Sequence, residues 1–370
     1  MENNGQEISL IFELVDYMEG VNKMRHVLAI TMGDPSGIGP EIAVKALGNT
    51  SIYERCIPII IGDLEPMKDA IRFTGSSLKI NVIKEPSQAR GEPGVIDLID
   101  MGFLAVGSWE YKKVAQLTGL ASFRYVEKAI ELALAGAVDA TVTGPINKEA
   151  INMAGFDYSG HTEIYADLTG VSDYAMLLAS GNFRVIHVST HVSMRDACKL
   201  VTAERVFRVI TLAKEAMDLI GIKNPRIAVA GFNAHCSENG LFGNEEADAI
   251  IPAIEKARAQ GMDVTGPVPP DTVFVKAIAG SFDIVVAMYH DQGHIPLKLC
   301  GFKMDPATGS YTSVSGINCT IGLPIIRTSV DHGTAFGKAG EGRANEESLM
   351  DAIEMAIVIS SRKKTGWDAC

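Results

Sequence analysis

Three histidines each follow a short apolar segment, and imidazole is a good ligand for transition metals. His191, His235 and His290 come soon after runs rich in Val, Ile and Ala. If these runs are strands, three distant segments each bring one imidazole to a common ion. Neutral imidazole suits zinc, cobalt, nickel or iron better than magnesium. A histidine after a strand is also a common hydrogen-bonded structural residue, so the spacing alone leaves both interpretations open.

The remaining basic and polar candidates have two interpretations each. His187 lies inside the apolar run before His191, so we expect it in the core or beside a metal ligand; His26 and His294 receive no role. Lys298, alone in apolar sequence, either extends its ammonium group to solvent or binds an anion.

Arg327, the segment GHTE and a glycine-rich segment are further candidates for ligand binding. Arg327 is isolated after an apolar run and can hold a phosphate or carboxylate through two parallel hydrogen bonds. The segment GHTE begins a predicted helix, in which Thr162 either caps the helix or contacts a ligand. The glycine-rich segment GDPSGIGPE links a strand to a helix and lacks both the Walker and the GxGxxG signatures, so it is an anion site or a tight turn.

The elements that must position these residues alternate between short Val- and Ile-rich runs and longer helical patterns. This alternation is typical of a mostly parallel sheet covered on both faces, so the predicted fold class is α/β. The predicted strands are residues 26–31, 57–62, 140–143, 184–189, 226–230 and 283–287. The predicted helices are residues 40–47, 123–135, 203–220 and 245–260.

Polar or glycine-rich residues follow most of the predicted strands. In open α/β sheets ligands bind at the carboxyl edge, so we expect five of these loops to converge on one site there. The loops are residues 32–39, 144–148, 190–191, 233–235 and 289–293.

Composition limits the class of protein. The chain has 370 residues, of which 47% are hydrophobic and 21% charged, with a net charge of -12. These values exclude disordered, fibrous and disulfide-rich small proteins. The length predicts two domains or one large doubly wound unit, and two domains would enclose a cleft. No apolar run is long enough for a membrane span, and the acidic balance argues against nucleic acid or membrane partners. Six scattered cysteines favour reduced thiols and a cytoplasmic location.

The first residues have a pattern of their own. Residues 1–23 precede a segment, beginning at Met24, that reads as a buried first strand, and they lack the features of a signal peptide. We interpret them as an N-terminal extension from an upstream start codon, with a genuine N-terminal helix as the alternative. Residues 362–370 are predicted to be a tail.

Six motifs occur along the chain in a fixed order. They are GDPSGIGPE, TGPINKEA, GHTEIYA, the histidines after the predicted strands, AMYHDQG and GLPIIRTSVDHGTA. Together they resemble the 4-hydroxythreonine-4-phosphate dehydrogenase family of pyridoxine and pyridoxal phosphate biosynthesis, from about Met24 to about Ser361. The segments GPVPPDTVF and YHDQGHIPLKLCGF resemble more closely its 4-phospho-D-threonate and 4-phospho-D-erythronate dehydrogenase branch.

The resemblance implies a fold and an assembly. The fold is of the isocitrate and isopropylmalate dehydrogenase type, with two domains, a central mostly parallel sheet and an interdomain cleft. Residues 24–150 and 320–361 would form the first domain, and residues 151–319 the second, which would carry the metal and dimer residues. The implied homodimer shares its metal site, with His191 and His235 from one chain and His290 from the other.

The resemblance also implies residue roles. Substrate contacts would be His161, Thr162, Lys298, Asn318 and Arg327. The adenine side of the cofactor would lie against His332, Gly333 and Thr334. Lys298, ranked first, and Asp291 are the candidates to remove the hydroxyl proton.

The implied reaction is an oxidation of a 3-hydroxy acid with a 4-phosphate, followed by decarboxylation. Its substrate would be 4-hydroxythreonine 4-phosphate, 4-phospho-D-threonate or 4-phospho-D-erythronate, and its hydride acceptor NAD, with NADP as an alternative. One divalent ion would stabilise the developing negative charge. Zinc is the preferred ion, and magnesium, cobalt and manganese are alternatives.

One segment departs from the resemblance, and three other functions stay open. Residues 303–317 are longer than the vitamin-pathway branch would have; their Gly, Ser, Thr and Pro content predicts a loop, either a substrate lid or a passive insertion. A decarboxylating cis-dihydrodiol dehydrogenase would use the same metal on a substrate without phosphate. A phosphate acyltransferase-like enzyme would need no NAD, and a non-catalytic phosphometabolite-binding module would leave the histidines without metal.

Overall fold

The computed structural model describes residues 25–307 and 311–364. The N-terminal extension predicted at residues 1–23 and most of the predicted tail, residues 365–370, fall outside the described residues. Residues 362–364 of that tail are the end of the last helix. No helix within the described ranges is long and apolar enough to cross a membrane.

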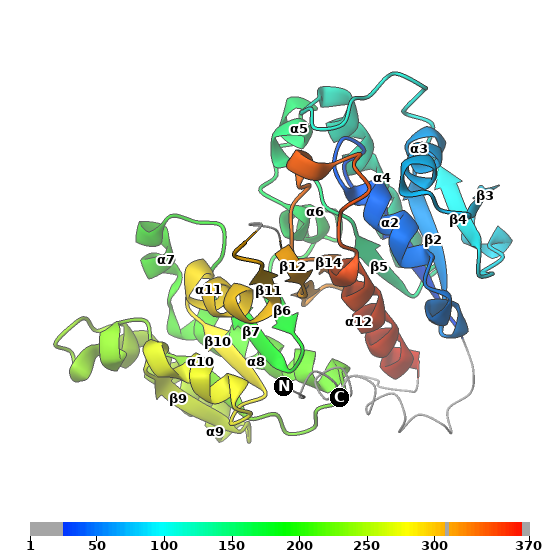
Figure 1. Ribbon diagram of the computed structural model, residues 1–370. Helices are drawn as coiled ribbons and strands as arrows, with labels where there is room; N and C mark the ends of the chain where they lie inside the picture. The colour runs from blue at the N-terminus through cyan, green and yellow to red at the C-terminus, as the bar shows by residue number, and fades with distance from the viewer. Residues whose placement is uncertain (1–24, 308–310, 365–370) are drawn as a thin grey trace.

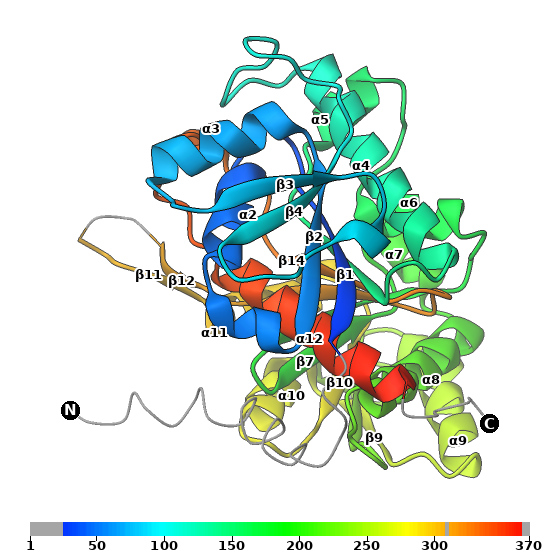
Figure 2. The same cartoon turned by 90° about the vertical axis from the view of Figure 1, so that its right-hand side faces the viewer.

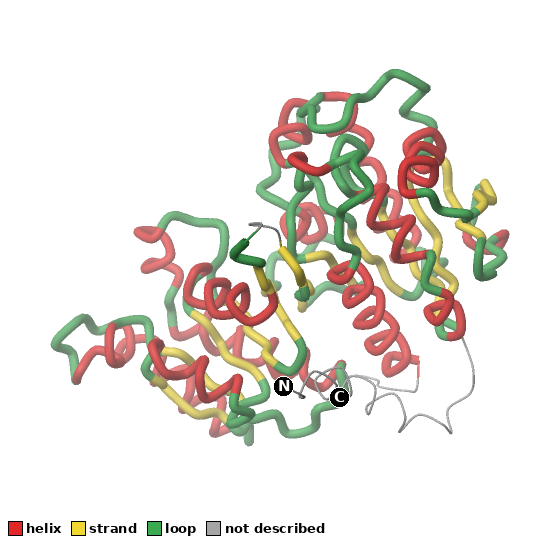
Figure 3. Tube along the Cα trace, in the orientation of Figure 1, coloured by secondary structure: helices red, strands yellow, loops and turns green. Residues whose placement is uncertain are grey.

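One twelve-stranded sheet runs through the described chain, in the order β3-β4-β2-β1-β5-β14-β13-β6-β7-β10-β8-β9. Figure 1 shows its two groups of strands at opposite ends of the molecule, and Figure 3 shows helices along both groups. The strands of this sheet are β1 His26–Thr31, β2 Cys56–Gly62, β3 Lys79–Ile83, β4 Val95–Asp100, β5 Ala140–Thr143, β6 Ala175–Ser180, β7 Phe183–His187, β8 Ile227–Ala230, β9 Val264–Val268, β10 Ile284–Ala287, β13 Ile317–Ile321 and β14 Arg327–Val330.

The prediction of an α/β fold with a mostly parallel sheet is confirmed, and the exceptions lie at its centre. Strand β13 pairs antiparallel with both β14 and β6, and β6 pairs antiparallel with β7. Strands β7, β10, β8 and β9 therefore run opposite to β5, β1 and β2. The five loops therefore do not share one carboxyl edge, because the loops after β1 and β5 leave the sheet in the opposite direction to those after β7, β8 and β10. Two of them nevertheless meet, since Lys148, after β5, and His191, after β7, both approach Gly160.

Helices cover both faces of the sheet. They are α2 Gly39–Leu47, α3 Leu64–Thr74, α4 Gln116–Leu134, α5 Lys148–Met153, α6 His161–Leu168, α7 Met194–Leu200, α8 Ala203–Leu219, α9 Ile251–Ala259, α10 Pro270–Ile278, α11 His290–Gly301 and α12 Glu347–Lys364. The largest core cluster packs α2, α3, α4, α8, α9 and α12 on the strands. A second cluster joins α10 and α11 to β6, β7 and β10, and a third joins α4, α5 and α6.

The segment predicted as a loop at residues 303–317 contains strand residues at both ends. Strands β11 Phe302–Met304 and β12 Tyr311–Val314 form an antiparallel hairpin, and β13 begins at Ile317. Figure 2 shows this hairpin projecting from the side of the molecule. The loop prediction is therefore wrong for seven of the fifteen residues, namely 303, 304, 311–314 and 317; residues 308–310 lie outside the described part.

The two predicted domains each supply neighbouring strands. The first contains β1 to β5 and β14, and the second contains β6 to β10. Strand β13 spans the predicted boundary between residues 319 and 320. Because one continuous sheet links both parts, the division stays a prediction.

Candidate active site

Arg327 is the centre of a polar group on the middle strands of the sheet. It opens β14 and is 3% exposed. One terminal nitrogen, Nη2, donates to Thr143 Oγ1 at 3.0 Å, and the other, Nη1, donates to Thr320 Oγ1 at 3.1 Å and Asn318 Oδ1 at 3.3 Å. The pairing of β5, β14 and β13 aligns these three partners on one face, because residues two apart on a strand share a face.

The charge of Arg327 is buried without a neutralising partner. No carboxylate of the described residues lies in ion-pair contact with it, and its Nε atom has no hydrogen-bond partner there. Burial lowers the pKa of Arg327, because a buried cation loses hydration. A cation left in this state is suited to receive an anionic ligand, which would supply the missing negative charge.

The start of α6 lies against this group. Thr162 Oγ1 is 3.5 Å from Thr320 Oγ1, and the Arg327 guanidinium lies 5.6 Å from the centre of the Tyr165 ring. Gly160 is the residue before the helix and no side chain caps it, so the capping alternative for Thr162 is wrong. The structure therefore brings together four predicted substrate contacts: His161, Thr162, Asn318 and Arg327.

His161 presents a neutral imidazole at this helix start. Its Nε2 atom is buried and has no hydrogen-bond partner among the described residues. Burial, together with the charges of Arg327 and Lys148, holds the pKa of His161 well below its ordinary value. The ring is therefore uncharged at neutral pH and has an unused nitrogen.

Lys298, the fifth predicted substrate contact, has a partner of its own. Its ammonium group donates to the backbone oxygen of Asp331 at 2.5 Å and to Asp331 Oδ2 at 2.6 Å, and it lies 4.2 Å from the centre of the Phe302 ring. Asp331 follows β14 at the end opposite to Arg327. Lys298 and Arg327 are thus held at the two ends of one strand.

Two of the predicted metal ligands are neighbours in a single chain. The ring centres of His191 and His290 are 5.8 Å apart. His191 Nδ1 lies 3.0 Å from Glu163 Oε1, and His290 Nδ1 lies 2.6 Å from Asp291 Oδ1. Each ring thus has its Nδ1 on a carboxylate, which leaves Nε2 for a metal, as is common for metal-binding histidines.

His235 lies on an unusual turn after β8. Five consecutive residues have positive φ angles: His235, Cys236, Ser237, Glu238 and Asn239, with φ of 50°, 56°, 72°, 44° and 57°. The left-handed conformation is costly for residues other than glycine and is found mainly at functional sites. The buried carboxylate of Glu246 anchors the start of the turn, because it accepts hydrogen bonds from the Phe232 and Asn233 amides at 2.8 and 2.7 Å.

The donor set fits a transition metal, but one chain does not complete it. Imidazoles with a free Nε2 are suitable ligands for zinc. Within residues 25–307 and 311–364, no three His, Cys, Asp or Glu side chains come close enough to hold an ion. His191 and His290 lie together, whereas no described contact joins His235 to either. The predicted distribution of ligands between two chains stays a prediction.

The predicted cofactor segment, residues 332–334, contacts the glycine-rich segment GDPSGIGPE. The Ile38 amide donates to Thr334 O at 3.0 Å, and a Cβ on Gly37 would lie 2.9 Å from Thr334 Cβ. The amides of Ser36 and Gly37 are also paired, both with Asp34. These amides are unavailable to an anion, so the tight-turn interpretation of GDPSGIGPE is favoured.

Asp34 is itself a buried acid beneath this turn. It is fully buried, and its Oδ2 atom has no hydrogen-bond partner among the described residues. Burial raises the pKa of Asp34 to about 6, although the Ser36 amide opposes this shift.

Three residues at the site were missed by the sequence reasoning. His294 was given no role, yet its ring stacks on that of His290 with centres 3.6 Å apart, and its four-residue spacing in α11 was the available signal. Glu163 and Lys148 lie inside quoted motifs without an assigned role. A Cβ added to Gly160 would lie 3.3 Å from Glu163 Oε2, 3.8 Å from Lys148 Cε and 3.9 Å from His191 Cε1, so these side chains meet around Gly160.

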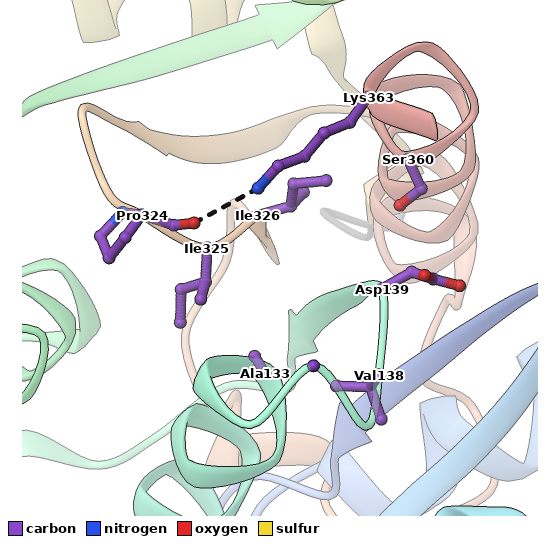
Figure 4. Close-up of a pocket in the computed structure, with 9 residues that line it drawn as sticks. Ala133, Val138, Asp139, Pro324, Ile325, Ile326, Ser360 and Lys363 are labelled. Carbon is purple, nitrogen blue, oxygen red and sulfur yellow. Dashed lines mark hydrogen bonds between the residues drawn. The ribbon is translucent and has the colours of Figure 1, made fainter. Parts of the chain in front are cut away.

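A cavity of about 260 Å³ lies elsewhere. Figure 4 shows its lining, with Lys363 donating to Pro324 O at 3.3 Å. It is bounded by residues that precede β5 and β14 and by the ends of α4 and α12, and it contains none of the predicted site residues. It is therefore not the predicted substrate cleft.

Comparisons with known proteins agree on one family. The family model described as pyridoxal phosphate biosynthetic protein PdxA matches residues 54–356. The chain is 45% identical over 338 residues to D-threonate 4-phosphate dehydrogenase of Cupriavidus necator, covering 91% of this chain and 98% of that protein.

Solved structures give the same result. A 4-hydroxythreonine-4-phosphate dehydrogenase from Klebsiella pneumoniae superposes with a TM-score of 0.79 at 42% identity, covering 92% of this chain and 99% of that one. A terephthalate 1,2-cis-dihydrodioldehydrogenase from Burkholderia xenovorans gives 0.62 at 30% identity, covering 90% and 98%. The similarity is greater to the proteins named for phosphorylated substrates.

Proposed function

The chain belongs to the PdxA family of pyridoxal phosphate biosynthetic proteins, and from this membership we propose that it oxidises and decarboxylates D-threonate 4-phosphate. It is a dehydrogenase that acts on a CH–OH group of a phosphorylated substrate. The single observation that best supports an acidic substrate is the buried guanidinium of Arg327, which has no carboxylate partner among the described residues.

The chemistry divides into two steps. Removal of hydride from C3 and of the proton from its hydroxyl group gives a 3-keto acid, and loss of CO2 from C1 then leaves a three-carbon hydroxyketone phosphate after protonation at C2. NAD or NADP supplies the hydride acceptor, and a divalent cation, preferably zinc, supplies positive charge beside the oxygen that becomes anionic.

The residues of this chain have separate parts in our proposal. Arg327 and Asn318 bind an anionic group of the substrate, and His161 with Thr162 contacts it from the start of α6. Lys298 lies at the other end of β14 and contacts a second polar group, with its direction fixed by Asp331. As an ammonium ion Lys298 must release a proton before it can act as a base, and Asp291 is the alternative base.

We assign the cofactor and the metal ion to the residues that the sequence predicted for them. His332, Gly333 and Thr334 would line the cofactor site, where their segment packs on the glycine-rich turn. His191, His235 and His290 would hold the ion through Nε2 atoms.

We also propose a homodimer that completes the metal site. The ligand set is incomplete among the described residues of one chain. Large apolar side chains are exposed on the segments that carry His191 and His290 and on the hairpin that follows α11: Val192 before α7 and Met194 at its start, Ile295 and Leu299 on α11, and Met304 and Tyr311 on the hairpin. Ile295 and Leu299 are four residues apart and share a helix face. A second copy covering this surface would remove it from water.

The test is a spectrophotometric assay of NADH and NADPH formation. The candidate substrates are D-threonate 4-phosphate, D-erythronate 4-phosphate and 4-hydroxythreonine 4-phosphate, each with zinc, cobalt, manganese or magnesium. We expect the greatest kcat/KM with D-threonate 4-phosphate, release of one CO2 per turnover, and no turnover of D-threonate without phosphate. Equal turnover of the unphosphorylated acid, or absence of turnover with all three phosphates, would contradict the proposal.

A further inference from the structure

Glu163 makes a direct contact with one of the predicted metal ligands. It lies in the first turn of α6, next to Thr162, and its Oε1 atom is 3.0 Å from His191 Nδ1. The two residues come from segments 28 positions apart, so the contact is produced by the fold. The side chains are 24% and 27% exposed, so water competes only in part for this hydrogen bond.

The contact selects one form of the His191 ring. A neutral imidazole carries its proton on Nδ1 or on Nε2, and only the nitrogen without a proton binds a metal. A carboxylate oxygen accepts hydrogen bonds and donates none when ionised. Its position at Nδ1 therefore favours the form with a proton on Nδ1 and a free electron pair on Nε2.

The second oxygen of Glu163, Oε2, is buried beside Gly160 and has no hydrogen-bond partner in the described chain. A Cβ on Gly160 would lie 3.3 Å from that oxygen, which is closer than most side-chain contacts, whereas its distance of 3.9 Å from His191 Cε1 would be ordinary contact. The extended φ of 168° at Gly160 is open to any residue, so a side chain at this position would press on Glu163 alone.

We propose that Glu163 is a positioning residue that fixes the tautomer and direction of His191 for metal binding. This inference rests on the proposed metal-dependent function. It adds to that function a link between the substrate-binding end of α6 and the metal, because Thr162 and Glu163 are consecutive residues of one helix. A carboxylate that is hydrogen-bonded to a metal-binding histidine commonly changes metal affinity by 10- to 100-fold.

Metal affinity provides a test that does not depend on turnover. The full-length protein is stripped with a chelator and titrated with Co²⁺, followed by visible absorption and calorimetry, for the wild type, E163A and E163Q. We expect E163A to weaken Co²⁺ binding 10- to 100-fold. E163Q keeps an oxygen acceptor and should retain tighter binding than E163A. The matched control is E149A, which removes an exposed carboxylate from the first turn of α5 and should bind Co²⁺ like the wild type.

A double-mutant comparison separates positioning from a general structural effect. If Glu163 acts through His191, E163A should have no further effect on Co²⁺ affinity in the H191A background. Nitrogen-15 NMR of the metal-free protein should show the His191 proton on Nδ1 in the wild type and a shift toward Nε2 in E163A. Thermal unfolding is measured for each variant, so that a loss of folding is recognised.

The outcomes distinguish this inference from the proposed function. Unchanged Co²⁺ affinity in folded E163A, with a wild type that binds Co²⁺ and turns over substrate, would overturn the role of Glu163 and leave the function intact. Equal effects of E163A in the wild-type and H191A backgrounds would also overturn it. A wild type that turns over substrate but binds no Co²⁺ or Zn²⁺ would overturn the role of Glu163 together with the metal site.

Discussion

Lys298 donates hydrogen bonds to two oxygens of Asp331, the backbone oxygen at 2.5 Å and Oδ2 at 2.6 Å. The carboxylate is almost buried, with 6% of the side chain exposed, whereas the lysine side chain is 33% exposed. Burial raises the pKa of Asp331, and the charge of Lys298 opposes that shift. The pair therefore fixes the lysine at the end of β14, beside a buried acid.

Removal of Lys298 should affect activity and stability separately. We expect K298M to lower kcat by at least about 100-fold, the usual scale for a proton-transfer group. It should also destabilise the protein at pH 8 by about 2 kcal/mol, because an unpaired buried carboxylate remains. Addition of D331N should restore stability but leave kcat low. Full activity in K298M, measured by steady-state kinetics, would remove Lys298 from the mechanism.

Arg327 should matter for substrate binding more than for stability. We expect R327M to lower kcat/KM by about 100-fold while the Tm stays the same or rises, because the variant loses a buried charge that no carboxylate neutralises. The matched control is R184M, which removes another buried guanidinium, bonded to Asn182 O at 3.1 Å. R184M should spare kcat/KM, because among the described residues Arg184 bonds only Asn182 and Asp283 and none of the predicted substrate contacts. A fall of several degrees in the Tm of R327M would indicate a structural role.

His235 can be tested without disturbing its backbone. Asparagine adopts positive φ angles more readily than alanine, so H235N should keep the turn at φ 50° while removing the imidazole. We expect both H235N and H235A to lose metal in elemental analysis and to lose activity at least 1000-fold. H235A should be less stable than H235N by about 1 kcal/mol. Retention of a full equivalent of metal in H235N would exclude His235 as a ligand.

The raised pKa of Asp34 predicts how the stability of the protein changes with pH. Its pKa is about 6 in the folded protein, against 3.8 for an exposed aspartic acid. The folded state therefore binds more protons than the unfolded state between these values, and stability is lost as pH rises through about 6. The loss is on the order of 3 kcal/mol for this shift. In urea unfolding at pH 5 and pH 8, D34N should show a smaller difference than the wild type; an unchanged difference would assign the effect to other groups.

The proposed homodimer depends on the apolar surface of α11. Leu299 is 77% exposed, so L299E changes little within one chain but places a charge in the proposed interface. We expect L299E to be monomeric by light scattering at concentrations where the wild type is dimeric, and to bind Co²⁺ at least 10-fold more weakly. V106E is the control, because Val106 is 81% exposed in the connection between β4 and α4. A dimeric L299E would place the interface elsewhere.

Local pattern predicted six of the twelve strands of the described sheet and five of the eleven described α-helices. Strands β1 and β5 have the predicted bounds, because each is an apolar run between polar residues. Helix α4 begins at Gln116, seven residues before the predicted start. Glycine weakens a helix, so Gly119 argues against the earlier start when only the local sequence is considered. That glycine packs so close to the Ala150 backbone that a Cβ would lie 1.9 Å from its oxygen. Contact with another helix thus decided the position, and no local pattern records it.

The relative direction of the two halves could not be inferred from the alternation of strands and helices. It depends on β13, a five-residue strand that pairs antiparallel with β14 and β6. Its sequence, INCTI, has no signal that distinguishes parallel from antiparallel pairing. The resemblance predicted Arg327 and Asn318 as substrate contacts without knowledge of the strand directions. Glu163 stands out only through its contact with His191, which is 28 residues away in the sequence.

The left-handed turn that carries His235 has a consequence for the order of folding. Each non-glycine residue in this conformation costs roughly 1–2 kcal/mol, so five in succession cannot form before the rest of the protein supports them. The support comes from Glu246, which lies in a later segment and accepts two backbone amides just before the turn. A newly made chain would thus place His235 only after β8 and the helices behind it have packed. In the proposed metal site, loading would then be a late event in maturation, and free ions would have little to bind on incompletely folded chains.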